Sequence, residues 1–254
     1  MNLNIRKIGF LINIIFVITL LVACSNASIC IQVCGGSSIQ EAVDTANPGD
    51  TIIVSDGTYT ENIKIDKSLN IKGNGPETVV DGNRLGPVFT IGKTDPNVKV
   101  VLSGFNIVNG KSSACGGGVI NNGTTTIEDS ILSRNSAFED GGAVINYGRL
   151  TVIGSDISLN TAIGNGGGIS NYGNAEVKES IVSKNMAACC GGGIANKNII
   201  TIINSNVSEN RANDMIGGVG GIFNGESGSA TIVGCSIVAN IGFDRGGLYN
   251  DRLG

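Results

Sequence analysis

Hydrophobic and polar positions along the chain repeat with a period of about 25 residues. Three blocks between residues 124 and 198 align without gaps, and a block at 99–123 precedes them with a shift of one residue. Two looser copies follow, with insertions around 215–220 and 226–229. A fixed period of this length is typical of a solenoid, in which each repeat packs on its neighbours along the chain.

Within each repeat, apolar side chains spaced two residues apart indicate three short strands. Thr125 and Ile127 begin the columns of the first strand, Ser130 and Leu132 those of the second, and Val119 that of the third. A spacing of two places side chains on the same face of a strand, so all three strands direct these columns inward. The sequence therefore predicts an all-β, right-handed parallel β-helix, a three-sheet solenoid of about eight coils around a narrow core.

Two columns of asparagine accompany these strands. Stacked Asn side chains can bond each other and the backbone from coil to coil, and such a ladder lets nearly untwisted sheets persist. We therefore expect a structural ladder rather than a row that contacts carbohydrate, above all where the alternation points the column inward. The column after the second strand contains Asn135, Asn160, Asn185, Asn210 and Asn240, and the column at the end of the third contains Asn121, Asn146, Asn171, Asn196, Asn224 and Asn250.

The segment before the repeat predicts a cap for one end of the solenoid. Residues 37–48 have apolar positions at helical spacing, and Ser38 and Glu41 have the spacing of a capping box. Strand-like segments follow, so the β-helix is expected to run from 49 to 254. Nothing comparable to the helix follows Asn250. Either a partner covers that end, or the chain is a shortened relative of longer proteins.

The N-terminus predicts export. Arg6 and Lys7 precede an apolar stretch at 8–22, which is short for a membrane span and typical of a signal peptide. The sequence Leu-Val-Ala-Cys ends at Cys24 and resembles a lipobox. We expect a signal peptide at 1–23, lipid attachment at Cys24 and a mature N-terminal segment at 24–36, with anchoring on the outer face of the cell membrane or in the periplasm or outer membrane. Cleavage without a lipid is the alternative.

Composition removes several kinds of chemistry. The 254 residues include 39 Gly and no His, which excludes a Ser-His-Asp triad and any His metal ligand. The net charge is −4 and no run of Lys or Arg occurs, so a nucleic-acid partner is not expected. We expect neither a bound metal ion nor a cofactor.

Six cysteines besides Cys24 raise the question of disulfides in an exported protein. Cys115 and Cys190 occupy equivalent positions three coils apart, about 14 Å, which is too far for a disulfide. Cys30 and Cys34 could pair locally. Cys189 and Cys190 could form a vicinal disulfide or bind a soft metal, but two turn residues are the simplest interpretation.

The sequence also resembles a known family. Ser38-Ile39-Gln40-Glu41-Ala42-Val43, the segment 48–54 and Val80-Asp81-Gly82 are similar to the start of pectin-lyase-like β-helix proteins. Gly141-Gly142-Ala143-Val144 and its copies look like the repeats of prokaryotic adhesin-like and polymorphic outer-membrane β-helix proteins. The resemblance implies a scaffold that hosts lyases, hydrolases, copper-site accessory proteins and binding proteins alike.

The active-site sets of these enzymes do not stand out in the sequence. Asp129 and Glu179 share an outward column two coils apart, about 9.6 Å, at the upper limit for an inverting carboxylate pair. We interpret them as solvated surface charges, and we therefore expect no catalytic residue. Arg134, Lys184 and Glu209 share another column and are also expected to be exposed.

The leading hypothesis is a non-catalytic cell-surface or periplasmic β-helix lipoprotein that serves adhesion or binds a glycan or a surface protein. The first alternative is a carbohydrate-active enzyme, a polysaccharide lyase or glycoside hydrolase on the same scaffold. The second is a periplasmic copper-site accessory protein, which the absence of His weakens. Function is expected in the variable outward positions and in the insertions near Met215 and Glu226.

Overall fold

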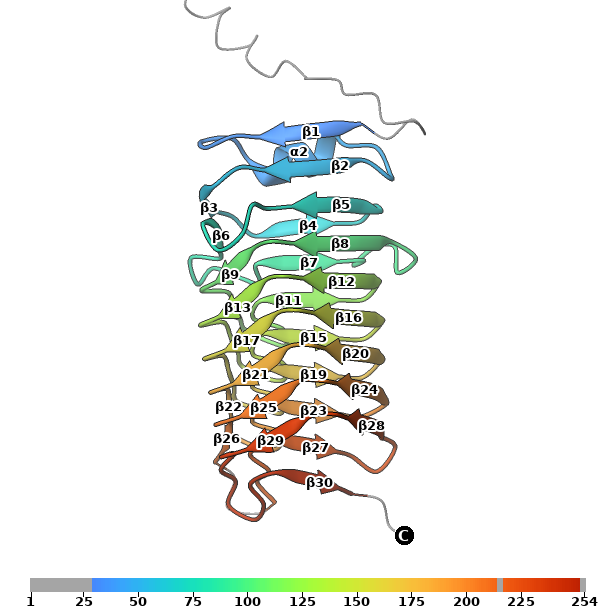
Figure 1. Ribbon diagram of the computed structural model, residues 1–254. Coiled ribbons are helices and arrows are strands. Elements are labelled where there is room, and N and C mark those ends of the chain that lie inside the picture. Colours follow the sequence, from blue (N-terminus) through green and yellow to red (C-terminus); the bar gives the residue numbers. More distant parts are fainter. Residues whose placement is uncertain (1–28, 214–216, 252–254) are drawn as a thin grey trace, which may run out of the picture.

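A computed structural model of the chain describes residues 29–213 and 217–251. The described residues wind into a rod of parallel strands, whose coils follow one another from the N-terminal end at the top of Figure 1 to the C-terminal end at its bottom. The prediction of a right-handed parallel β-helix is confirmed. The predicted signal peptide at 1–23, Cys24 and Met215 lie outside the described residues.

In the described part of the chain, the strands form four sheets along the rod, and all their pairings are parallel. The first sheet contains β1 (Cys30–Val33), β2 (Thr51–Val54), β5 (Leu69–Lys72), β8 (Lys99–Ser103), β12 (Thr124–Glu128), β16 (Arg149–Ile153), β20 (Asn174–Lys178), β24 (Ile199–Ile203) and β28 (Ser229–Val233). The second contains β3 (Gly57–Thr60), β6 (Thr78–Asp81), β9 (Asn106–Val108), β13 (Ile131–Ser133), β17 (Asp156–Ser158), β21 (Ile181–Ser183), β25 (Asn206–Ser208) and β29 (Ser236–Val238).

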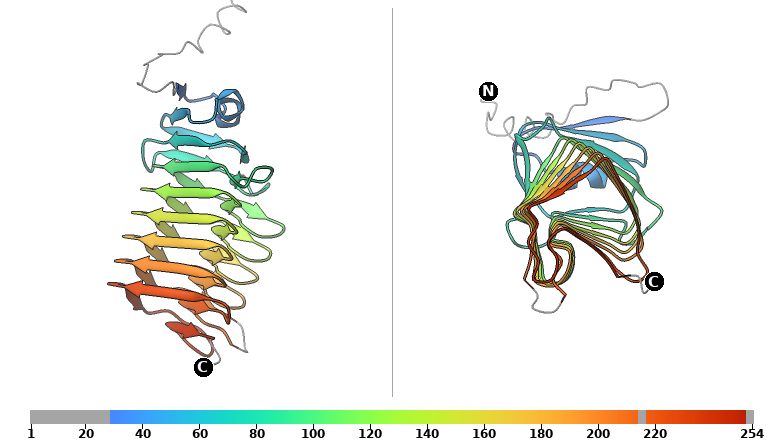
Figure 2. Two further views of the ribbon diagram at one scale, coloured as in Figure 1. Left: turned by 90° about the vertical axis from the view of Figure 1, so that its right-hand side faces the viewer. Right: turned by 60° about the horizontal axis from the view of Figure 1, so that its bottom comes forward.

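The third sheet contains β4 (Ile63–Ile65), β7 (Phe89–Ile91), β11 (Val119–Asn121), β15 (Val144–Asn146), β19 (Ile169–Asn171), β23 (Ile194–Asn196), β27 (Ile222–Asn224) and β30 (Leu248–Asn250). The fourth is short and contains β10 (Lys111–Ser112), β14 (Ser136–Ala137), β18 (Thr161–Ala162), β22 (Met186–Ala187) and β26 (Arg211–Ala212). Seen toward its end, the rod shows its later coils, coloured yellow to red, nearly superimposed (Figure 2, right).

The structure adds to the predicted architecture and corrects it in one place. The fourth sheet was not expected, because strands of two residues are too short to show an alternating pattern. The segment 24–36, predicted as the mature N-terminal segment, contributes β1, which pairs with β2 in the described part of the N-terminus. The one-residue shift predicted for the block at 99–123 is wrong, since Lys99 pairs with Thr124 and Val119 with Val144. Backbone pairing keeps the 25-residue register there although the side chains differ.

The helix α2 (Ile39–Thr45) covers the N-terminal end of the core, which confirms the predicted cap in a slightly shorter form. The Ser38 hydroxyl accepts a hydrogen bond from the Glu41 amide at 3.2 Å. A carboxylate from the next coil, Glu61, accepts from the amides of Ile39 and Gln40 at 2.8 and 2.9 Å and from the Ser38 hydroxyl at 3.0 Å. A negative charge at this position satisfies exposed helix amides, so the coil below positions the cap.

The core consists of stacked identical or similar side chains. Ile127, Val152, Val177 and Ile202 are fully buried one above the other in the first sheet. In the second-strand column, the Ser130 hydroxyl donates to the Glu128 carbonyl at 2.7 Å, and equivalent serines repeat this bond. The serine hydroxyl is small and bonds to the carbonyl two residues before it. The chain can therefore turn tightly between two sheets without leaving a buried polar group unpaired.

The repeated glycine pairs close the loop between the fourth and third sheets. Gly141 has a φ of 74°, a left-handed conformation that side chains with a Cβ disfavour. Gly142 has no room for a side chain, because a Cβ there would collide with the carbonyl oxygens of Gly167 and Thr161. These two constraints fold the loop back across the outer face of the third sheet. Within the described residues, no helix is both long and apolar enough to cross a membrane.

Candidate ligand-binding groove

The asparagines at the end of the third strand form a continuous chain of side-chain hydrogen bonds. The Nδ2 of Asn121 donates to the Oδ1 of Asn146 at 2.7 Å, and the same bond repeats from coil to coil up to Asn250. From Asn121 to Asn224 these residues are at most 3% exposed. The column is therefore part of the interior, and its amides are engaged in holding coils together.

The second asparagine column makes a denser version of the same ladder. Both the backbone amide and the Nδ2 of Asn135 donate to the Oδ1 of Asn160, at 3.0 and 3.1 Å. The pattern continues through Asn185 and Asn210 to Asn240. Both columns thus lie where a ligand on the rod's surface does not reach them, except at the last coil, where Asn250 is exposed.

The charged columns noted in the sequence lie at turns. Asp129 and Glu179 have φ values of 45° and 49°, and Gly154 between them has 57°. The column is the left-handed turn between the first and second sheets, where Asp, Asn and Gly are tolerated and the carboxylates point to solvent. Lys184 and Glu209 lie at the next turn, with an exposed contact of 3.9 Å between their charged atoms. Neither column contributes to the hollow described below.

A different cluster of polar groups forms beside the third sheet, one residue beyond the buried asparagines. Tyr147 and Tyr172 follow Asn146 and Asn171, and their rings stack with centroids 5.6 Å apart and planes inclined by 28°. Lys197 occupies the next coil, with its Nζ 2.8 Å from the Tyr172 hydroxyl and 4.8 Å from the Tyr172 ring centroid. Coil stacking therefore turns residues 25 apart in sequence into a surface row.

Asp140 joins this row from the loop between β14 and β15. Its residue is 8% exposed, and its Oδ2 accepts a 2.5 Å hydrogen bond from the Tyr172 hydroxyl. Its Oδ1 accepts from the backbone amide and the side chain of Asn165 at 2.7 and 3.1 Å. The Lys197 Nζ lies 3.9 Å from Oδ2, so a largely buried carboxylate is held by donors on one side and a cation on the other.

Burial raises the pKa of both tyrosine hydroxyls further above the neutral range. Desolvation raises the pKa of Tyr172 well above its ordinary value, and the hydrogen bond to Asp140 and its negative charge raise it further. Desolvation is also the largest cause that raises the pKa of Tyr147, and its hydrogen bond with Cys115 is the second. The cluster therefore presents hydroxyl groups rather than phenolates over the whole neutral range.

A thiol and a second carboxylate complete the rim. The Cys115 Sγ donates to Glu139 Oε2 at 3.1 Å. Burial is the largest of the causes that raise the pKa of the Cys115 thiol, so it stays a protonated donor at neutral pH. Glu139 itself is exposed at the surface.

These side chains surround a surface hollow of about 550 Å³, which we call the lateral groove. Its volume is within the range of small-molecule sites, roughly 300–1,000 Å³. A second hollow of about 530 Å³ adjoins it, and the two share Phe138 and Ile163, which are 63% and 55% exposed. The lateral groove is lined by Cys115, Phe138, Glu139, Asp140, Tyr147, Ile163, Gly164 and Tyr172.

Sequence reasoning missed this groove. The position after each third-strand asparagine could have indicated it. In four successive coils this position is occupied by Asn122, Tyr147, Tyr172 and Lys197. Only the fold shows that Asp140 reaches the same row, because its loop crosses the outer face of the third sheet.

The described cysteines form no disulfide in the structure. Cys30 and Cys34 carry separate thiols. The Cys189 thiol donates a hydrogen bond to the Cys190 sulfur at 3.4 Å, and the two sulfurs are not joined covalently. Across residues 29–213 and 217–251, no three Cys, Asp or Glu side chains gather as they would around a metal ion.

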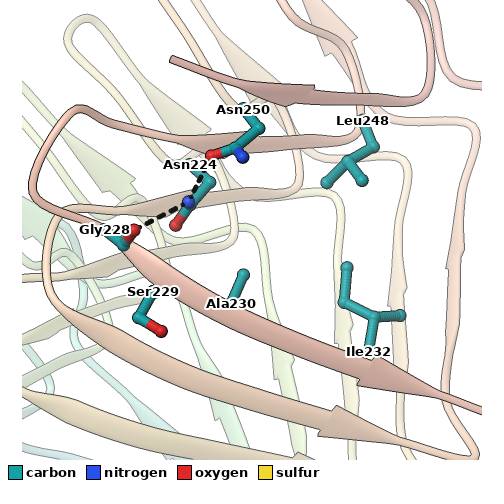
Figure 3. A pocket seen from close by; sticks show the side chains of 7 residues that line it. All are labelled: Asn224, Gly228, Ser229, Ala230, Ile232, Leu248 and Asn250. Carbon is teal, nitrogen blue, oxygen red and sulfur yellow. Dashed lines mark hydrogen bonds between the residues drawn. The ribbon is translucent and has the colours of Figure 1, made fainter. Parts of the chain in front are cut away.

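The C-terminal end of the rod presents the inward face of its last described coil. Ala230, Ile232 and Leu248 border a hollow of about 260 Å³ together with the end of the asparagine ladder (Figure 3). There Asn224 Nδ2 donates to Asn250 Oδ1 at 2.8 Å and to the Gly228 carbonyl at 3.0 Å. Leu248 is 47% exposed, whereas equivalent positions inside the rod are fully buried.

Comparison with known proteins gives one limited similarity. No family model matches the chain, and no solved structure matches it significantly. Over 78 residues, 30% of this chain, the sequence is 37% identical to a protein of Methanothermus fervidus described as a cell surface glycoprotein. That stretch spans 12% of the length of the relative. The similarity is consistent with a surface β-helix protein, and the pectin-lyase-like resemblance has no matching family model behind it.

Proposed function

We propose that this chain is a non-catalytic β-helix protein of the cell surface or periplasm that binds an extracellular ligand, in adhesion or a related contact. The observation that carries the proposal is the lateral groove, where exposed apolar side chains and hydrogen-bonding groups lie together on a rigid scaffold. Binding residues on stacked coils need no loop closure, so such a site is organised before its ligand arrives. The similarity to a cell surface glycoprotein supports a surface location.

Binding and adhesion can be tested with the purified protein coupled to beads. We expect the beads to adhere to surfaces coated with a polysaccharide or an extracellular protein, and the soluble chain to compete for that adhesion. Bovine albumin on identical beads is the control. Beads that adhere to none of the surfaces would contradict the proposal.

A carbohydrate-active enzyme remains the second candidate, because the groove contains the carboxylates of Glu139 and Asp140. Asp140 already accepts three hydrogen bonds, which engages both of its oxygens and favours a positioning role over proton transfer. Incubation with polysaccharides, with and without calcium, should therefore release no oligosaccharides. Release that disappears in Glu139→Gln would replace the binding proposal with the enzymatic one.

The proposal includes a lipid anchor at Cys24, supported by the lipobox-like sequence before it. In cells that process lipoproteins, the Cys24→Ala variant should move from the membrane to the soluble fraction. A Cys34→Ala variant is the matched control, since that exposed thiol lies outside the lipobox. Membrane association that persists in Cys24→Ala would show that the lipid is not the anchor.

A further inference from the structure

We propose that the lateral groove binds a neutral pyranose unit of a glycan and excludes uronic acids. This inference rests on the proposed binding function and names the ligand class of its site. Three properties of the groove lead to it: an exposed apolar platform, hydroxyl and carboxylate groups beside that platform, and a lining without basic side chains among the described residues.

The platform consists of Tyr147, Phe138 and Ile163, which are 48%, 63% and 55% exposed. Tyr147 and Phe138 belong to one coil and Ile163 to the next, so the three surround the hollow from two sides. One face of the Tyr147 ring packs on Tyr172, which holds the ring in place. The C–H face of a pyranose ring is apolar and of similar breadth to an aromatic ring, and rigid aromatic rings bury such faces at little cost in side-chain entropy.

Polar groups stand next to this platform at fixed positions. Tyr172 is held by Asp140 and Lys197, and Asp140 by Asn165, so these side chains cannot turn away. Glu139 is positioned by the Cys115 thiol at 3.1 Å and is exposed to the hollow. Because three hydrogen bonds already engage Asp140, the exposed Glu139 is the carboxylate expected to accept from sugar hydroxyls, which carboxylate oxygens bind strongly. A pre-positioned acceptor lowers the ordering cost of binding.

Charge decides between classes of sugar. The groove lining contains two carboxylates, Glu139 and Asp140, and no Lys or Arg among the described residues. Lys197 is not part of the lining; its Nζ lies 2.8 Å from the Tyr172 hydroxyl and 3.9 Å from Asp140 Oδ2, so its positive charge is already paired with a carboxylate. The neighbouring hollow has Lys111, which is exposed to solvent. A uronate carboxylate in the lateral groove would face like charges, whereas a neutral hexose would not.

The shared edge of the two hollows indicates a ligand longer than one ring. Phe138 and Ile163 line both, and the neighbouring hollow adds Ala137 and the polar side chains of Ser136 and Thr161. A second sugar of the same chain would therefore lie along the fourth sheet. A protein ligand is the competing class, since exposed Phe and Ile also occur in protein interfaces, and the test includes it.

The experiment measures binding of purified protein to neutral glucan, mannan and galactan and to polygalacturonate, by affinity electrophoresis and calorimetry. We expect at least one neutral polysaccharide to bind and polygalacturonate to bind at least about tenfold more weakly, a difference of about 1.4 kcal/mol. The Tyr147→Ala variant should lose at least about tenfold in affinity for the neutral glycan, while Tyr147→Phe keeps most of it because the ring remains.

Phe243→Ala is the matched control, because Phe243 is an aromatic residue 69% exposed that does not line the groove. Its affinity should equal that of the unchanged protein. Thermal unfolding followed by circular dichroism identifies any variant that has lost its fold, and Glu139→Gln, at an exposed position, supplies a second groove variant.

The outcomes separate this inference from the proposed function. Glycan binding that is unchanged in Tyr147→Ala and Glu139→Gln would overturn the site while leaving the binding function standing. Tighter binding of polygalacturonate would overturn the ligand class. Adhesion to protein surfaces without binding to any neutral polysaccharide would show a protein ligand instead, and absence of all adhesion would contradict both proposals.

Discussion

Two neighbouring columns at the end of the third strand behave in opposite ways. In successive coils the first reads Asn146, Asn171 and Asn196, while the second, one residue later, reads Tyr147, Tyr172 and Lys197. The first is fully buried and each amide bonds to its copy in the next coil. The second lies at the surface, and its Tyr172 and Lys197 contact Asp140, a residue from a different part of the coil.

The difference shows where a repeat protein has freedom to evolve chemistry. An inward residue meets its own copy above and below, so any change must suit three coils at once. An outward residue meets solvent and one loop, and can therefore change in a single coil. The lateral groove arises at the place where the two columns adjoin, since the rigid ladder holds the variable row in position.

The largest effect is expected for Asn171→Ala. In the unchanged protein, the Asn171 Nδ2 donates to Asn196 Oδ1 and to the carbonyls of Gly173 and Ile199. Its Oδ1 accepts from the Asn146 Nδ2, and alanine makes none of these bonds. Several buried polar groups left unsatisfied should reduce the free energy of unfolding by about 3–5 kcal/mol. Urea denaturation followed by circular dichroism measures it. A loss below about 1 kcal/mol would show that the inner column is not a ladder of structural importance.

Ile202→Ala should cost about 2–4 kcal/mol, because its side chain is fully buried between coils. Ile232, which pairs with it in the last described coil, is only partly buried, so Ile232→Ala should cost less than half as much. The same denaturation measurement compares the two variants. Equal losses would indicate that the C-terminal coil is covered in the protein in solution.

Lys197→Met tests the tolerance of the outer column. Its ion pair with Asp140 is partly exposed and spans 3.9 Å, so its loss should change the free energy of unfolding by no more than about 1 kcal/mol. Thermal unfolding at two salt concentrations measures the change. A loss as large as that of Asn171→Ala would remove the distinction between the columns.

The smallest effect is a dependence on alkaline pH. Because the folded chain raises the pKa of Tyr172, it holds that proton more tightly than the unfolded chain does. The resulting stabilisation is complete below the ordinary tyrosine pKa of 10.0 and is lost as pH rises through the higher folded value. The free energy of unfolding should therefore fall above about pH 10, and less steeply in Tyr172→Phe. Identical slopes would contradict the assigned burial.

Much of the interior could be predicted from the sequence. A side chain that meets its own copy must recur at the coil period, so the apolar columns, the inward serines and the asparagine columns are visible as repeats. Ser38 could be assigned to the start of the helix because capping depends on neighbours in the chain. The carboxylate that completes that cap, Glu61, comes from the next coil and has no local signature.

The solenoid, its period and its inward side chains can be derived from the residues alone, since they follow from alternation and repetition along one chain. The fourth sheet and the lateral groove depend on how the coils pack. Strands of two residues carry no readable pattern, and the glycine-rich loop brings Asp140 over the third sheet through backbone contacts between coils. The contacts of Asp140 with Tyr172 and Lys197 depend on the spacing between coils and on the position of the bend in the loop. The residue types alone do not specify either.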